Sequence, residues 1–89
     1  MLSNYMEDIA IQAARKMPSE FVFEKCIEEA IELIDAIIHR DRSTDRNLPQ
    51  ELADLEVALL IAKHHVDYYA VEDCLVKSWE KVKRRLADA

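Results

Sequence analysis

Apolar residues recur every three or four positions along most of the chain, which is the period of an α-helix packed on one side. The pattern predicts four helices, at about residues 3–16, 19–40, 49–65 and 70–86, joined at 41–47 by a polar loop and at 66–69 by a short turn. Met17 and Pro18 end the first helix because proline disfavours the helical conformation in the residue before it. Ser19 is the candidate cap of the second helix, and Pro49 suits the first turn of the third.

The composition favours helices throughout, since the chain has no glycine, only two prolines, and much alanine, leucine and glutamate. Short connections between amphipathic helices make antiparallel neighbours, so we expect an all-α, four-helix bundle-like subunit with residues 1–89 as one domain. A core of this size gives marginal stability, and the third helix is apolar on nearly all sides. We therefore expect a homodimer or tetramer that buries Leu59, Leu60 and Ile61.

The net charge and the lack of a leader-like or membrane-spanning stretch limit the partners that we expect. A formal net charge of -6 argues against binding a nucleic-acid polymer, because no basic excess is available to replace counterions along the phosphate backbone. Cys26 and Cys74 lack the spacing of a metal site or a redox motif, so we interpret both as reduced thiols. We interpret His64 and His65 as ordinary residues at a helix end. Without a leader-like N-terminus or a membrane-spanning stretch, we expect a cytoplasmic protein with no membrane partner.

Acidic residues cluster on the second predicted helix, in the run EEAIELID at residues 28–35. Glu29 and Glu32 lie one turn apart and about 60° apart around the helix axis, so their carboxylates can converge on one ion. Both lie away from the apolar stripe, which consists of Phe23, Ile27, Ala30, Ile31, Ile34, Ile37 and Ile38. A solvated acidic face would show the same pattern, so this pair alone does not identify a site.

Glu51 and Asp54 on the third predicted helix differ from that pair because their surroundings are apolar. A helical projection puts both carboxylates among the apolar side chains of residues 52–62. An uncompensated buried carboxylate is costly, so a positive charge must meet it or its pKa must rise. A salt bridge from Lys25 or Arg15 is one solution. A hard cation such as Mg²⁺ or Mn²⁺ is the other, since it prefers carboxylates and water.

Basic residues recur every four positions along the fourth predicted helix. We call Lys77, Lys81 and Arg85 the basic ridge; they border an apolar stripe of Val71, Leu75, Trp79, Val82 and Leu86. A solvated cationic segment near a helix C-terminus would also interact favourably with the helix dipole. Beside a metal site, the same ridge suits the oxygens of a triphosphate.

Three runs together resemble the MazG-like family of all-α nucleoside triphosphate pyrophosphohydrolases: EEAIE at 28–32, ELAD at 51–54 and KSWEKVKRR at 77–85. The resemblance covers about residues 22–87. It implies that Mg²⁺ is bound by Glu29, Glu32, Glu51 and Asp54, and that phosphates are contacted by Lys81 and Arg85, with Lys25 where some relatives have a lysine. Trp79 stands where many relatives have asparagine, which leaves the preferred base and sugar open.

The residues and the resemblance together favour Mg²⁺-dependent hydrolysis of a nucleoside or deoxynucleoside triphosphate to the monophosphate and pyrophosphate. A metal held by the acids would neutralise phosphate charge and acidify a water. Glu28, or another of the clustered acids, is the candidate base that orients this water for in-line attack. Lys25, Lys77, Lys81 and Arg85 are the candidate substrate contacts.

Several alternatives remain open from the sequence. Stacking by Phe21, Tyr68 or Trp79 is compatible with any nucleobase. Phosphoribosyl-ATP pyrophosphohydrolase is a second enzymatic interpretation that fits the run ELADL at 51–55. That relative also has a glycine-containing segment before the acidic helix and a tyrosine-histidine pair after the aspartate, and this chain has neither. A non-catalytic helical dimerisation or adaptor module, with merely solvated acids, is a third interpretation.

Overall fold

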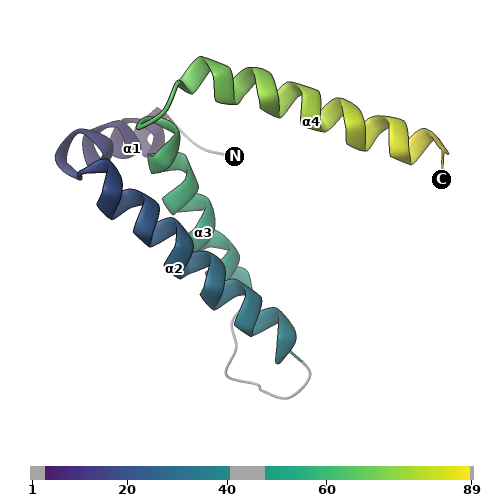
Figure 1. Cartoon of the computed structure of the whole chain (residues 1–89), viewed down its shortest axis with the longest axis horizontal. Coiled ribbons are helices and arrows are strands. Elements are labelled where there is room, and N and C mark those ends of the chain that lie inside the picture. Colours follow the sequence, from purple (N-terminus) through teal and green to yellow (C-terminus); the bar gives the residue numbers. More distant parts are fainter. Residues whose placement is uncertain (1–3, 41–47, 89) are drawn as a thin grey trace.

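The computed structural model describes residues 4–40 and 48–88. They form four helices and no strand: α1 (Asn4–Lys16), α2 (Ser19–Ile38), α3 (Leu48–Lys63) and α4 (Tyr68–Asp88) (Figure 1). The all-α prediction is therefore confirmed. The predicted loop at 41–47, and residue 3 at the expected start of the first helix, lie outside the described residues. None of the described helices combines the length and the apolar character that crossing a membrane requires.

The start of α2 differs slightly from the prediction. Pro18 occupies the cap position with an extended backbone (φ -62°, ψ 149°) and no side-chain hydrogen bond, so Ser19 is the first helical residue rather than the cap. Pro49 lies in the first turn of α3, as predicted. The ends of α2 and α3 come two residues earlier than expected, a difference that is common where helices fray.

The start of α4 shows a cap that the sequence analysis missed. α4 begins at Tyr68, so the predicted turn at 66–69 was wrong for its last two residues. Asp67 explains the early start, because its Oδ1 accepts a hydrogen bond of 3.1 Å from the backbone N–H of Ala70. This is the contact by which an N-cap residue satisfies a free donor in the first turn.

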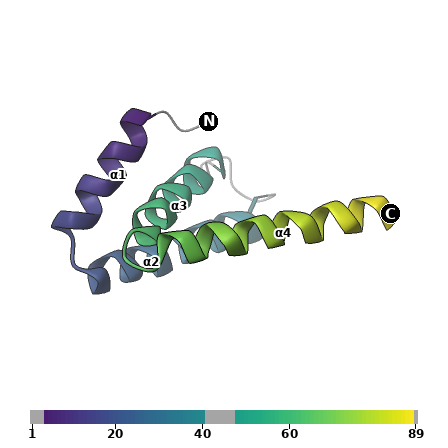
Figure 2. The same cartoon turned by 90° about the horizontal axis from the view of Figure 1, so that it is seen from above.

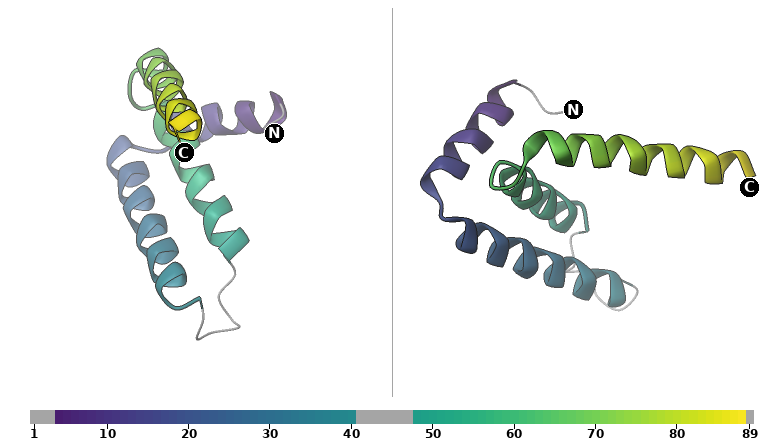
Figure 3. Two further views of the ribbon diagram at one scale, coloured as in Figure 1. Left: turned by 90° about the vertical axis from the view of Figure 1, so that its right-hand side faces the viewer. Right: turned by 45° about the horizontal axis from the view of Figure 1, so that its top comes forward.

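α2 and α3 form an antiparallel hairpin whose contact face is built from small side chains (Figures 1 and 3). Val22 and Ala36 of α2 and Ala58 of α3 are 2%, 0% and 8% exposed. The helices approach closely enough for the Sγ atom of Cys26 to lie 3.5 Å from the carbonyl oxygen of Ala58. α1 packs on the other side of α3 and buries Ala10 and Ala14 (Figure 2). Close contact between small residues thus holds the hairpin together.

The predicted isoleucine stripe of α2 does not face α3. Ile27 and Ile34 are 60% and 56% exposed, and by helical periodicity they lie on the side of the hairpin opposite Lys25 and Asp54. Exposed leucines of α3 extend the same side. We call this surface the isoleucine face; it consists of Phe23, Ile27, Ile34 and Ile37 of α2 with Leu52 and Leu59 of α3. An exposed apolar surface of this extent is unusual for a single soluble chain.

α4 points away from the hairpin (Figures 1 and 3). None of its described residues is buried, and Trp79 is 65% exposed. Contacts at its base set its direction: the Nζ of Lys63 donates a hydrogen bond of 2.7 Å to the Oε1 of Glu72, and the rings of Tyr68 and His64 stack with centroids 5.0 Å apart. The antiparallel neighbours expected from the short connections are therefore α2 and α3, whereas α4 does not pack along them within one chain.

Candidate metal centre

Sequence spacing brings three carboxylates into the seam between α2 and α3. Glu29 lies seven positions from buried residues on either side of it in α2, and Glu51 lies seven positions before Ala58, so both share a helix face with the core. Asp54 follows one turn after Glu51, and all three acids are half-buried. The Oδ1 of Asp54 accepts a hydrogen bond of 2.7 Å from the Nε2 of Gln50, which orients that carboxylate.

The acids form two overlapping groups. In each group, one oxygen of every member lies within 4.8 Å of the others; the groups are Glu28, Glu29 and Glu32 along α2, and Glu29, Glu51 and Asp54 across the seam. Glu29 belongs to both groups and is therefore the centre of the cluster. The structure thus brings together the four predicted metal ligands and the predicted base, while their binding of a metal stays a prediction.

Among the described residues Lys25 pairs with acids of its own helix, and not with Glu51 or Asp54, which the salt-bridge alternative assigned to it. Its Nζ lies 3.6 Å from the Oε1 of Glu28 and 3.8 Å from the Oε1 of Glu29. The other candidate partner, Arg15, is exposed on α1. Despite Lys25, the Oε2 atoms of Glu29 and Glu51 are buried and have no hydrogen-bond partner among the described residues. Buried polar atoms are normally paired, so these two oxygens are candidates for a ligand.

The electrostatics of the cluster also favour a cation. The pKa of Glu29 is raised above its ordinary value, mainly by loss of hydration, then by the charge and hydrogen bond of Glu32 and by the charge of Asp54; Lys25 lowers it in part. A divalent cation would offset this repulsion and satisfy the orphan oxygens. Because every candidate ligand in the two groups is a carboxylate, these groups suit the hard ions Mg²⁺ or Mn²⁺.

Other predicted groups lie elsewhere. The basic ridge is on α4, which leads away from the cluster and does not pack on α2 (Figure 1). The structure therefore does not bring the ridge to the acids within one chain.

Two of the histidines lie near acids outside the two acidic groups. The Nδ1 of His39 lies 3.1 Å from the Oδ1 of Asp35, and the Nε2 of His64 lies 3.4 Å from the Oε1 of Glu7. His39 and His64 therefore belong to helix-end contacts and not to the acidic groups.

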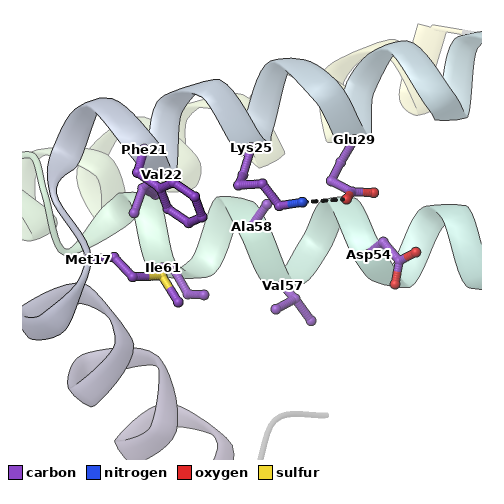
Figure 4. A pocket seen from close by; sticks show the side chains of 9 residues that line it. All are labelled: Met17, Phe21, Val22, Lys25, Glu29, Asp54, Val57, Ala58 and Ile61. Atoms are coloured by element: carbon purple, nitrogen blue, oxygen red, sulfur yellow. Dashed lines mark ion pairs between the residues drawn. The ribbon is translucent and has the colours of Figure 1, made fainter.

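A cavity of about 320 Å³ continues from the acids along the groove between α2 and α3 (Figure 4). Its acidic end contains Lys25, Glu29 and Asp54, its other end is lined by Met17, Phe21, Val22 and Ile61, and Val57 and Ala58 lie between the two ends. The sequence analysis named Phe21 only as one of three aromatic candidates and missed the cavity. The available signal was the four-residue spacing of Phe21, Lys25 and Glu29, which puts their side chains on one face of α2.

Comparison with known proteins identifies one family. The family model described as MazG nucleotide pyrophosphohydrolase domain matches residues 17–88, which is most of the chain and includes both acidic groups and the basic ridge. No curated protein and no solved structure gives a significant match. The family match therefore agrees with the resemblance that the three sequence runs carry.

Proposed function

Because the chain belongs to the family of MazG nucleotide pyrophosphohydrolase domains, we propose that it hydrolyses a nucleoside or deoxynucleoside triphosphate to the monophosphate and pyrophosphate. The observation that carries this proposal is the convergence of Glu29, Glu51 and Asp54 from two helices to within 4.8 Å of one another. In the reaction, water attacks phosphorus, the anhydride bond between the α- and β-phosphates breaks, and pyrophosphate leaves.

Glu29, Glu32, Glu51 and Asp54 would hold Mg²⁺, and Mn²⁺ would suit the same oxygens. The orphan oxygens of Glu29 and Glu51 support this assignment, because a cation would give each of them a partner. When bound, the metal supplies positive charge against the phosphate oxygens and acidifies a water. Partial burial of the carboxylates reduces screening by water, which strengthens each interaction in the site.

Glu28 and Lys25 have separate roles in the proposal. The Glu28 side chain is 56% exposed, so water reaches its carboxylate, which accepts the proton of the attacking water. Lys25, with its Nζ between Glu28 and Glu29, can turn toward a phosphate oxygen when the substrate enters. Its ammonium then compensates the substrate's charge instead of the carboxylates' charge.

The basic ridge reaches the phosphates only in an assembly. Lys81 and Arg85 are exposed on α4, which points away from the acids of its own chain (Figure 3). The isoleucine face and the apolar stripe of α4 are also exposed, and a second copy of the chain would cover both. We therefore infer a homodimer or tetramer in which α4 of one copy brings its ridge to the acidic groups of another.

Pyrophosphate release from a panel of nucleoside triphosphates, deoxynucleoside triphosphates and phosphoribosyl-ATP tests the proposal. Activity should require Mg²⁺ or Mn²⁺, disappear in EDTA and disappear in the Glu51→Ala variant. The matched control is Glu56→Ala, which removes an exposed acid of the same helix. Turnover of phosphoribosyl-ATP alone would replace the proposed substrate class. Absence of turnover across the panel would favour a non-catalytic module.

A further inference from the structure

The cavity beside the acidic groups has two chemically different ends. Lys25, Glu29 and Asp54 lie at one end, and Figure 4 shows Phe21 and Ile61 grouped at the other. Asp54 and Ile61 are two turns apart on α3, which is about 10 Å along the helix axis. A small molecule that fills this groove should therefore carry its charge at one end and an apolar surface at the other.

We propose, on the premise that the chain hydrolyses nucleoside triphosphates, that the apolar end of this cavity holds the nucleobase with the ring of Phe21 against its face. Phosphates held by a cation on Glu29 and Asp54 would direct the sugar and base along the groove, and the apolar end is continuous with that position (Figure 4). The cavity volume of about 320 Å³ lies at the lower end of the range of about 300–1,000 Å³ that small-molecule sites occupy.

Phe21 is the aromatic residue that the fold puts in the groove. Of the other two candidates, Tyr68 already stacks on His64 with ring centroids 5.0 Å apart, and Trp79 is 65% exposed on α4. Phe21 lines the cavity and is 47% exposed, so a flat ligand has access to its ring. Stacking on such a ring tolerates any base, because every base has an aromatic face.

The composition of the apolar end predicts weak selection among bases. Met17, Phe21, Val22 and Ile61 offer no conventional hydrogen-bond donor or acceptor on their side chains. The polar edge of the base must then face the open side of the groove, where water can satisfy it. Apolar pockets distinguish similar ligands only modestly, so kcat/KM for dATP, dGTP, dCTP and dTTP should fall within about tenfold of one another.

Paired phenylalanine variants test the base site. Phe21→Ala should raise KM for all four deoxynucleoside triphosphates by about tenfold, while the inhibition constant of inorganic tripolyphosphate, which has no base, stays unchanged. Phe23→Ala removes the same side chain two positions away, outside the cavity, and should leave the ratio of nucleotide KM to tripolyphosphate inhibition constant unchanged. Light scattering on both variants shows whether either substitution changes the oligomeric state, so that an effect on assembly is not mistaken for an effect on base binding.

A filling variant gives an independent check. Val57 lines the cavity between Asp54 and Ile61 and is 59% exposed, so Val57→Trp narrows the path to the apolar end without disturbing the core. It should raise KM for dATP and dGTP more than for dCTP and dTTP. If Phe21→Ala and Val57→Trp leave every nucleotide KM unchanged, or shift tripolyphosphate equally, the base lies elsewhere. A difference in kcat/KM of more than about 100-fold between any two of the four nucleotides would contradict recognition of the base by an apolar surface. If wild type releases no pyrophosphate, the proposed function fails first.

Discussion

Glu29 on α2 and Asp54 on α3 bring carboxylate oxygens within 4.8 Å of each other across the hairpin. Like charges at this distance repel, and partial burial strengthens the repulsion because less water screens it. The contacts that hold the two helices together there are small apolar ones, at Val22, Ala36 and Ala58. Repulsion within the acidic groups therefore destabilises the metal-free fold, and a bound cation would remove that repulsion.

Millimolar Mg²⁺ should raise the melting temperature of the protein. A ligand at about 100 times its Kd stabilises the folded state by about 2.7 kcal/mol, which corresponds to about 15 °C for a domain of this size. Glu51→Ala and Asp54→Ala should abolish this response and the pyrophosphate release together, whereas Glu56→Ala keeps both. Thermal unfolding with and without EDTA measures the shift. Metal-dependent turnover that survives in either ligand variant would contradict the assignment.

Glu29 should make the metal-free protein less stable as pH rises toward neutrality. Its pKa is raised in the folded chain, so the folded state binds a proton there more readily than the unfolded chain does. The stabilisation is full below the ordinary pKa of glutamate and is lost as pH rises through the raised value. In EDTA, Glu29→Gln should flatten this part of the stability curve. Glu20→Gln, an exposed acid of the same helix, should keep the wild-type slope; identical curves for all three proteins would refute the prediction.

Local spacing made the helices and the acidic groups predictable. Helical periodicity put Glu51 among the apolar residues of α3, but it put Glu29 away from the isoleucine stripe of α2, whereas the structure places Glu29 half-buried beside Glu51 and Asp54. Periodicity could not decide which apolar stripe of α2 meets α3. The large side chains of Ile27 and Ile34 were the obvious core candidates, yet Val22 and Ala36 are buried, because the close approach of the helices leaves room only for small residues.

Helical periodicity also could not predict the direction in which α4 runs. It depends on contacts between the end of α3 and the start of α4, where Lys63 bonds Glu72 and Tyr68 stacks on His64. The amphipathic pattern of α4 says only that one side needs a partner, and it does not say whether that partner belongs to the same chain. For the same reason the cavity was missed, because its two walls come from different helices, whose facing residues are 25 positions apart at Glu29 and Asp54 and 40 at Phe21 and Ile61.

Lys81→Ala and Arg85→Ala should weaken substrate binding without unfolding the protein. Both side chains are exposed on α4, and exposed residues away from special features change stability by less than about 0.5 kcal/mol when substituted. KM should rise for nucleoside triphosphates and the inhibition constant of tripolyphosphate should rise with it, because the lost contact is to phosphate. Steady-state kinetics and thermal unfolding on the same samples test this. A large fall in melting temperature would mean that the ridge is structural.

The isoleucine face should be an interface between copies of the chain. Ile34→Lys puts a charge at an exposed position of that face, so it should not disturb the fold of one chain but should disfavour its burial by another. Light scattering should report at least a dimer for the wild type and a species near 10.3 kDa for the variant. A wild-type protein that is active as a single chain of that mass would refute the interface.

The last prediction tests whether one copy completes the site of another. Glu51→Ala destroys the acidic groups of its own chain, and a Lys81→Ala, Arg85→Ala double variant lacks the ridge, so each protein alone should be nearly inactive. If α4 acts in trans, unfolding and refolding them together in equal amounts makes mixed assemblies. Some acidic groups then meet an intact ridge, and random pairing should restore about one quarter of wild-type activity.

The control for this mixture is Glu51→Ala refolded with Asp54→Ala. Both variants lack a metal ligand, so every acidic cluster in their assemblies is defective and no activity should return. The two mixtures experience the same refolding and contain the same total protein, and they differ in whether any chain carries intact acidic groups for a neighbour's ridge to meet. If neither mixture recovers activity while native mass spectrometry shows mixed assemblies, the ridge does not act in trans. Recovery in the first mixture alone requires that Lys81 and Arg85 of one chain serve the acids of its neighbour.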